Sequence, residues 1–412
     1  MGRIKVCDAQ SLSGSPQAQK AVEMTYSMMK LYCDTVYLQE CMVPHWVRGE
    51  KETARITGTK KGNINVNILA LGGSIATPDK GITAEVIMIT DFNELEKLGE
   101  KKIKGKIIFY NHPFNNANIN TFKSYGECVE YRWAGPARAA KLGAVATVVR
   151  SMTGTIDEYP HTGSMRYDSA GIKIPCAAIA TRDAELLINI LKTEGKATLF
   201  MKMNCQTLPD EKSFNVIGEI RGSVNPDQII LVGGHLDSWD VGEGAHDDGA
   251  GVVQSMEALR LFKASGIRPK HTLRAVLFMN EENGLRGGTK YAEVVKSKNE
   301  KHLAAIETDA GGFTPHGFGM DITDTQFQKA TGWAPLLLGF GLHELSRGGG
   351  GADIGPLKKQ EVPLFGLHPD SQRYFDFHHT NADVFEAVNK RELELGGAAI
   401  AALMYLIDNY GW

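Results

Sequence analysis

The sequence predicts an α/β protein whose main sheet is mixed and flanked by helices. Three short runs, 229–232, 273–279 and 303–308, are mainly apolar, as strands buried on both faces of a sheet are. Between the first two runs, apolar residues recur at helical spacing over 252–262, and Gly266 provides a stop signal. Strands that alternate with helices are typical of this fold class.

Residues that can bind a metal ion stand where these runs end. The first run leads through two glycines to His235 and Asp237. The second run ends in Glu281 and Glu282, and Asp309 closes the third. Open α/β sheets bind ligands at this edge. Imidazole and carboxylate groups are zinc ligands where no thiolate is offered, and one carboxylate can bridge two ions about 3.5–4 Å apart. We therefore predict a paired divalent metal site. Its ligand-type residues are His235 and Asp237, Asp247 and Asp248, Glu281 and Glu282, Asp309, and His379.

The composition limits the kinds of protein that this chain can be. A length of 412 residues suggests two or three domains, and a net charge of −3 implies no basic face for nucleic acid. No apolar run reaches the roughly 20 residues that span a bilayer. The six cysteines lack C-x-x-C spacing, which indicates free buried thiols, with a disulfide as the alternative for an exported chain. The first seven residues are too short and polar to be a secretory signal.

The chain divides into a discontinuous domain and an insertion. Ser15-Pro16 has the pattern of a helix N-terminus. Short strands recur over 51–205, which we expect to be the inserted domain, while 1–50 and 206–412 form the other domain. Helices are expected at 132–142 and 184–191, and strands at 35–38, 64–69, 84–89, 106–110, 144–149, 172–175, 176–179, 197–201 and 214–220.

The C-terminal part is expected to contain helical segments and a glycine-rich loop. The pattern over 324–338 is partly helical, and 392–407 reads as a packing helix. The loop 347–354 lacks the Gly-Lys-Ser/Thr that a phosphate loop requires, so we interpret it as a flexible or tightly turning loop near the cleft. Arg347 and Arg373 can bind a substrate carboxylate bidentately, although the sequence does not rank them above surface arginines.

Four motifs resemble those of the co-catalytic zinc peptidases of family M28. They are GGHLDSWDVGEGAHDDGAG, NEE, ETDA and HHTNAD. Within this family the chain resembles the carboxypeptidase Q-like (plasma glutamate carboxypeptidase-like) group, also through LSGS, PHWVRGE and GITAEV. The resemblance covers nearly the whole chain. It implies a zinc-exopeptidase (phosphorylase/hydrolase-like) fold with a protease-associated (PA) domain inserted over 51–205.

The resemblance also implies a role for each residue of the metal site. The ligands of one zinc ion would be His235, Asp247 and Asp309, and those of the other would be Asp247, Glu282 and His379. Asp247 would therefore bridge the two ions. Two zinc ions lower the pKa of a shared water toward about 7, so hydroxide is available at neutral pH.

Carboxylates outside the ligand set are expected to complete the chemistry. Glu281 resembles the general base, which takes a proton from the water and passes it to the leaving amine. Asp237 resembles the carboxylate behind His235, where it can hold the non-ligating N–H of the ring. Asp383 can serve His379 in the same way.

Four neighbouring residues have predicted roles outside the ligand set. Asp248 is expected to cap the following helix, and His246 to be a cleft residue or only a loop histidine. His378 is interpreted as a structural neighbour of the ligands. Tyr374 either donates to an oxyanion or packs in the core.

The activity that the resemblance implies is that of a di-zinc exopeptidase of carboxypeptidase or dipeptidase type. It would act on short peptides through a metal-bound hydroxide, as a secreted or periplasmic homodimer whose signal segment precedes residue 1. An aminopeptidase of the same fold and a catalytically inactive binding protein are the alternatives. An inactive relative is expected to have lost ligands, whereas all five are present here.

Overall fold

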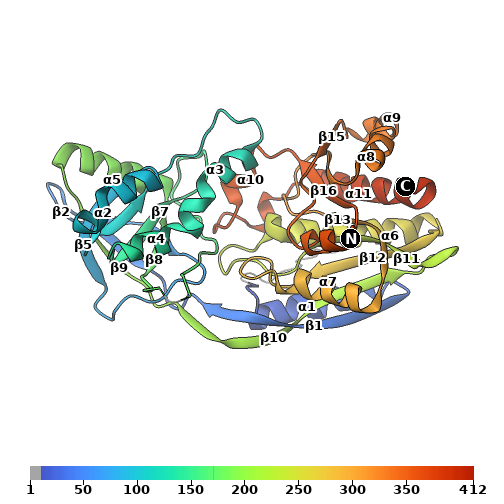
Figure 1. Cartoon of the computed structure of the whole chain (residues 1–412), viewed down its shortest axis with the longest axis horizontal. Helices are drawn as coiled ribbons and strands as arrows, with labels where there is room; N and C mark the ends of the chain where they lie inside the picture. Colours follow the sequence, from blue (N-terminus) through green and yellow to red (C-terminus); the bar gives the residue numbers. More distant parts are fainter. Residues whose placement is uncertain (1–10, 170) are drawn as a thin grey trace. The chain divides into compact units, whose positions relative to one another are not determined.

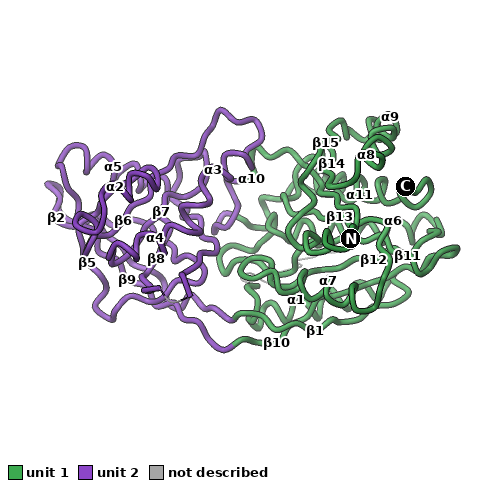
Figure 2. Tube along the Cα trace, viewed as in Figure 1, with its two compact units in different colours: residues 1–44, 210–374, 383–412 green, residues 45–209, 375–382 purple. Residues whose placement is uncertain are grey.

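A computed structural model describes residues 11–169 and 171–412 of the chain, which divides into two compact units (Figure 2). Unit 1 comprises Met1–Pro44, Asp210–Tyr374 and Asp383–Trp412, and unit 2 comprises His45–Pro209 and Phe375–Ala382. The chain therefore enters unit 2 twice. The second entry is short, and it contains the predicted ligand His379.

Unit 1 is built on an eight-stranded mixed sheet (Figure 1). In sheet order its strands are β1 (Thr35–Val47), β10 (Gln206–Ile220), β12 (His271–Phe278), β11 (Asn225–His235), β13 (Lys301–Glu307), β16 (Leu364–Pro369), β14 (Pro315–Asp321) and β15 (Glu344–Arg347). The three apolar runs became β11, β12 and β13, and β11 is parallel to both neighbours. His235 pairs with Phe278, and Gly233 pairs with Glu307. The carboxyl ends of the three strands therefore meet at one edge.

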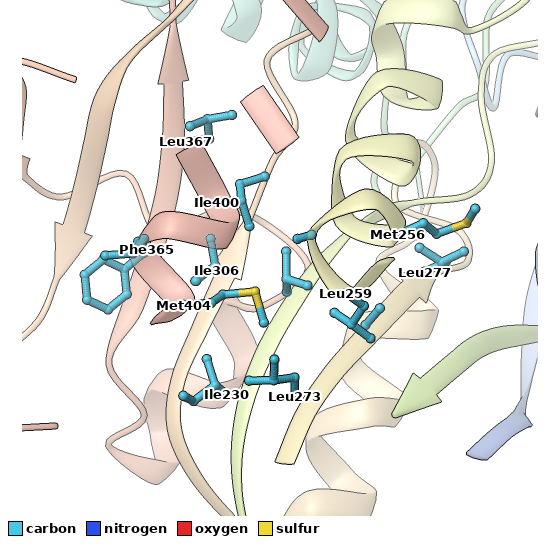
Figure 3. Close-up of a cluster of buried hydrophobic side chains, with 14 of the residues drawn as sticks. Ile230, Met256, Leu259, Leu273, Leu277, Ile306, Phe365, Leu367, Ile400 and Met404 are labelled. Atoms are coloured by element: carbon cyan, nitrogen blue, oxygen red, sulfur yellow. The ribbon is translucent and has the colours of Figure 1, made fainter. Parts of the chain in front are cut away.

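Helices cover both faces of this sheet. Successive residues of β11 point to opposite faces, and each face packs against different helices. Ile230 belongs to a core cluster with Leu259 of α6 (Ala250–Ser265) and Met404 of α11 (Lys390–Tyr410), as Figure 3 shows. The next residue, Leu231, joins a second cluster with Tyr291 of α7 (Arg286–Lys298). Burying an aliphatic side chain of this size contributes about 1.5–3 kcal/mol. Both faces of the strand are therefore buried, as the apolar run predicts.

Local signals set the ends of two helices of unit 1. The Ser15 hydroxyl accepts the N–H of Ala18 at 3.1 Å and begins α1 (Pro16–Met29), with Pro16 in its first turn. Gly266 ends α6 in the left-handed conformation, with φ of 71°. These predicted helix ends are confirmed.

Unit 2 has its own eight-stranded sheet and its own helices. In sheet order the strands are β3 (Gly62–Val66), β2 (Thr53–Thr59), β9 (Thr198–Lys202), β5 (Ile82–Ile89), β6 (Ile107–Tyr110), β7 (Ala146–Arg150), β8 (Cys176–Ile179) and β4 (Ile68–Ala70). The helices are α2 (Phe92–Ile103), α3 (Thr121–Trp133), α4 (Gly135–Lys141) and α5 (Thr181–Glu194). Strands β5 to β8 run parallel, and apolar side chains from them, α2, α3 and α4 form a separate core.

Several predicted elements differ from the structure. The strand expected at 35–38 continues through Pro44 to Val47, and the strand entry expected at 172–175 has no regular structure. The partly helical pattern of 324–338 forms α8 (Asp324–Thr331) and α9 (Ala334–Leu337), between which Gly332 ends the first helix. Helices α2 and α7 were not anticipated by the apolar pattern.

Two further properties bear on the class of protein. Among the described residues, no helix combines the length and the apolar character that crossing a bilayer requires. The five described cysteines are free thiols, and Cys7 lies outside the described residues.

Candidate metal centre

His235 ends β11 and is buried in unit 1. Its Nδ1 lies 2.8 Å from the main-chain carbonyl oxygen of Asp237, which can accept the Nδ1 proton. This partner fixes the tautomer in which Nε2 carries the free lone pair. Nε2 lies 3.2 Å from Oδ1 of Asp247 and 3.5 Å from Oδ1 of Asp309. The imidazole therefore presents a ligand nitrogen to two carboxylates.

Asp248 joins the end of β11 to the start of α6. One of its carboxylate oxygens accepts the N–H of His235, and the other accepts the N–H of Gly251, both at 2.9 Å. The N-cap residue of α6 is Gly249, so Asp248 lies one residue before the expected cap position, although it accepts an N–H of the first helical turn and a second N–H from the strand. This close approach requires glycine at position 234, where a Cβ atom would lie 2.4 Å from Oδ2 of Asp248.

Asp247 lies in the turn η1 (Ala245–Gly249), which leads into α6. The carboxylate of Asp383 accepts the N–H of His246 at 2.7 Å and that of Asp247 at 3.1 Å. Asp383 thus fixes the main chain that carries the Asp247 side chain. The peptide bond between Asp247 and Asp248 is cis.

Glu281 and Glu282 follow β12, and the Asp237 carboxylate holds this segment. Oδ1 of Asp237 accepts the N–H of Asn280 at 2.6 Å and that of Glu281 at 3.0 Å. The sequence predicts that this carboxylate holds the His235 N–H, but Oδ1 lies 3.9 Å from Nδ1. The Asp237 carbonyl makes that bond instead, because the carboxylate is used to fix the glutamate pair.

Four of the five predicted ligands come together in unit 1. Ligand atoms of His235, Asp247 and Glu282 lie within 4.8 Å of one another, and so do those of His235, Asp248 and Asp309. Each group offers one imidazole and two carboxylates, a donor set that suits zinc. The two groups share His235, whereas the resemblance assigns the shared position to Asp247.

The charges of these side chains favour a bound cation. Burial lowers the pKa of His235, but the carboxylates of Asp309 and Asp247 outweigh burial and raise this pKa well above its ordinary value. Burial raises the pKa of Glu281 and of Asp248 well above the usual range, and the Asp309 charge adds to both shifts. Crowded buried carboxylates hold protons where no other positive charge is near. Divalent ions would supply that charge, so the residues present fit a metal centre.

The fifth predicted ligand, His379, belongs to unit 2. Its Nδ1 lies 3.2 Å from the carbonyl oxygen of Thr162, and its own carbonyl accepts the N–H of Thr162 at 3.1 Å. The sequence predicts that Asp383 holds the His379 ring, and this stays a prediction. Nδ1 is directed to the Thr162 carbonyl, while Asp383 holds the turn around Asp247. Thr162 gives no signal in the sequence, because it acts through its main chain.

The neighbouring histidines and Tyr374 are placed as follows. His246 stacks on Phe313 with ring centroids 4.2 Å apart, and its Nδ1 accepts the N–H of Gly312 at 3.2 Å. Burial lowers the pKa of His246 to about 4, so it is a neutral, structural imidazole. His378 stacks on the neighbouring His379 ring. Burial, followed by the charges of nearby carboxylates, raises the pKa of Tyr374 well above its ordinary value, so its hydroxyl stays protonated.

The two arginines considered for substrate binding both contact carboxylates of the chain. Arg373 binds Glu392 at 2.7 and 2.9 Å, and Arg347 binds Asp324 at 2.5 Å. These ion pairs give neither arginine a preference for a substrate carboxylate.

Comparison with known proteins identifies the family. Residues 215–404 match peptidase family M28. The chain is 40% identical to carboxypeptidase Q of Xenopus laevis over 399 residues, and 36% identical to that of Bos taurus over 397 residues. Each alignment covers 96% of this chain and 82% of the relative. A crystal structure of a peptidase M28 precursor from Shewanella amazonensis SB2B superposes with a TM-score of 0.94 at 32% identity, covering 98% of this chain and 91% of that one.

The similarity to the solved structure extends over both units. The region that matches the family contains all the grouped ligand residues of unit 1. A relative at 40% identity over almost the whole chain is sufficient to assign the family. The chain therefore belongs to peptidase family M28, as a metallopeptidase similar to carboxypeptidase Q.

Proposed function

We propose that the protein is a di-zinc exopeptidase that hydrolyses short peptides or dipeptides, acting as a carboxypeptidase or dipeptidase. The observation that carries this proposal is the grouping of His235, Asp247, Glu282 and Asp309 near the carboxyl ends of three parallel strands. Membership of family M28 and the similarity to carboxypeptidase Q support it.

His379 is the proposed fifth ligand. It stands four residues before Asp383, whose carboxylate accepts the N–H of Asp247 at 3.1 Å. Four residues of extended chain span at most about 14 Å, so covalent connection limits the distance between His379 and Asp383. We assign one zinc ion to His235, Asp247 and Asp309, and the other to Asp247, Glu282 and His379.

Glu281 is the proposed general base. The zinc ions, when bound, polarise the peptide carbonyl and lower the pKa of water. Burial raises the pKa of Glu281 in the zinc-free protein, and nearby cations, when bound, would favour its ionised form. It can therefore accept a proton from water and return it to the leaving amine. Asp237 positions Glu281 by accepting its N–H at 3.0 Å.

Dipeptides that differ only in a blocked terminus test the type of exopeptidase. An N-blocked dipeptide with a free carboxylate is expected to be hydrolysed, and a C-amidated dipeptide with a free amine is expected to be resistant. Product amino acids are quantified by chromatography. Cleavage of only the amidated substrate would assign aminopeptidase action to the same metal centre.

The variant Glu281→Gln tests whether the protein is a catalyst at all. We expect kcat to fall by about 10²–10⁴-fold, because the base is lost, while both zinc ions remain bound. Zinc is counted by plasma mass spectrometry in the same samples. Equal background rates in the wild type and the variant would instead support a binding protein without activity.

We also propose, from the resemblance to carboxypeptidase Q, that the protein is a secreted or periplasmic homodimer. Fractionation of cells that express the full-length gene product tests the compartment. Analytical ultracentrifugation tests the dimer, and a purely monomeric species at micromolar concentration would contradict it.

A further inference from the structure

The side chain of His379 is held by the inserted segment of the chain. Its Nδ1 lies 3.2 Å from the Thr162 carbonyl oxygen, and the Thr162 N–H donates to its carbonyl at 3.1 Å. Its backbone is left-handed, with φ of 61°, a conformation that surrounding contacts must hold in a residue other than glycine. Both bonds to Thr162 join residues of unit 2.

We propose that Thr162 and Arg132 are positioning residues of the metal centre, a role that rests on the proposed function of His379 as a zinc ligand. With its Nδ1 proton directed to the Thr162 carbonyl, the ring leaves Nε2 as its ligand atom. Thr162 belongs to unit 2, within the segment expected to be the PA-like insertion. Unit 2 therefore fixes the ring of one proposed ligand, His379.

Thr162 is rigid enough for this role. It is fully buried, and its hydroxyl donates to the carbonyl of Ala70 at 2.7 Å. The N–H of Gly72 donates to the carbonyl of the next residue, Gly163, at 3.0 Å. The segment around Thr162 is thus attached to the chain at and just after β4, an edge strand of the unit 2 sheet.

Arg132 holds the carbonyl oxygen that receives the His379 proton. The guanidinium is buried, and its NH1 donates to the Thr162 oxygen at 3.3 Å. Its NH2 donates to the Tyr125 hydroxyl at 2.7 Å. A Cβ atom at Gly163, where φ is 137°, would lie 2.4 Å from Cζ of Arg132, so glycine makes room for the guanidinium. A carbonyl oxygen has two lone pairs, one for each donor.

The helix α3 also holds the chain on either side of His379. Tyr125 and Arg132 are seven residues apart and share one face of α3. The Tyr125 ring stacks on Phe375 with centroids 4.9 Å apart and meets His378 edge-on at 5.2 Å. The contacts of α3 therefore fix the chain around His379, and through Thr162 they also fix the His379 ring.

The variant Arg132→Met tests this inference by zinc affinity. We expect one of the two zinc ions to bind about 10–100-fold more weakly, the usual effect of removing an outer partner of a ligand, while the other ion is unaffected. The affinity is measured by titrating chelator-stripped full-length protein with zinc against a chromophoric competitor. The absorption spectrum of the cobalt-substituted protein is expected to change for the same ion.

Arg150→Met is the matched control, because Arg150 is equally buried in unit 2 and contacts Glu185 and Asn111 instead. Equal zinc affinities in Arg132→Met and Arg150→Met would overturn the inference. The ligand variant His379→Ala separates the two claims, because zinc binding that survives it unchanged contradicts the proposed function itself. If Arg132→Met does not fold, Tyr125→Phe decides the matter, since it removes only the hydroxyl that Arg132 binds. Weaker binding of the same zinc ion by Tyr125→Phe supports the inference, and a zinc affinity equal to that of the wild type overturns it.

Discussion

Gly234 determines how closely the start of α6 approaches the end of β11. A Cβ atom there would lie 2.4 Å from Oδ2 of Asp248 and 2.9 Å from the carbonyl carbon of Gly251. We expect Gly234→Ala to lower the free energy of unfolding by about 1–3 kcal/mol, because these atoms belong to a buried, closely packed turn. Urea unfolding of the chelator-stripped protein measures the change. A stability equal to that of the wild type would show that the turn can shift without cost.

Titration of the buried acids makes the stability of the zinc-free protein depend on pH. Burial, with the nearby Asp309 charge, raises the pKa of Glu307 to about 8, and burial raises that of Asp353 well above its ordinary value. The pKa of His235 is also raised. The folded state therefore binds more protons than the unfolded state, so the free energy of unfolding falls as pH rises through these values.

For Glu307 the loss of stability extends from the ordinary pKa of 4.5 up to about 8, at no more than about 1.4 kcal/mol per pH unit for each group, and the measurement covers its upper part, above pH 7. Buried histidines with a lowered pKa, such as His161 and His302 at about 3, are largely neutral in both states in this window. Urea unfolding at pH 7.0, 7.75 and 8.5 in the presence of a chelator measures the slope, and zinc-loaded protein is the control. A stability that rises with pH would contradict the assigned directions.

Among the elements, α3 contains a weakness that lies away from its contacts with the His379 segment. Gly126 is an exposed residue within the helix, and a Cβ atom there would meet nothing within 4 Å. We expect Gly126→Ala to raise the free energy of unfolding by about 1 kcal/mol, because alanine loses less backbone entropy in a helix than glycine. Zinc affinity is expected to stay unchanged. Urea unfolding and zinc titration check the two results, and a destabilised variant would contradict the helix assignment.

Strands that consist of an almost continuous run of apolar residues could be predicted from the sequence. The runs at β11 to β13 are buried on both faces, and parallel neighbours bring their carboxyl ends together. The ligands that follow these strands were predictable for that reason. The helices α2 and α7 were not predicted. Although α7 buries Tyr291 and Val295, its apolar stripe is too narrow to give a clear helical pattern.

The partners of His379 could not be predicted, for a different physical reason. Its ring is held by the main chain of Thr162, 217 residues away in the sequence, and a carbonyl oxygen is common to all residue types. The expectation that the Asp237 carboxylate holds the His235 ring failed because this carboxylate accepts main-chain N–H groups instead. Residue spacing cannot distinguish these two uses of a carboxylate.

At the scale of the whole molecule, the residues proposed as ligands are distributed over both compact units of the chain. Four ligands lie in unit 1, while His379 and the Thr162 carbonyl that holds it belong to unit 2. The similarity to carboxypeptidase Q likewise covers 96% of the chain and includes both units. The insertion is therefore expected to be required for the metal centre itself.

The central claim is that residues far apart in the sequence bind two zinc ions. Anomalous diffraction at the zinc absorption edge, from crystals of the zinc-loaded full-length protein, tests it most directly. We predict two anomalous peaks, one in contact with His235, Asp247 and Asp309 and the other in contact with Asp247, Glu282 and His379. A single peak, or two peaks of which neither contacts Asp247, would contradict the account.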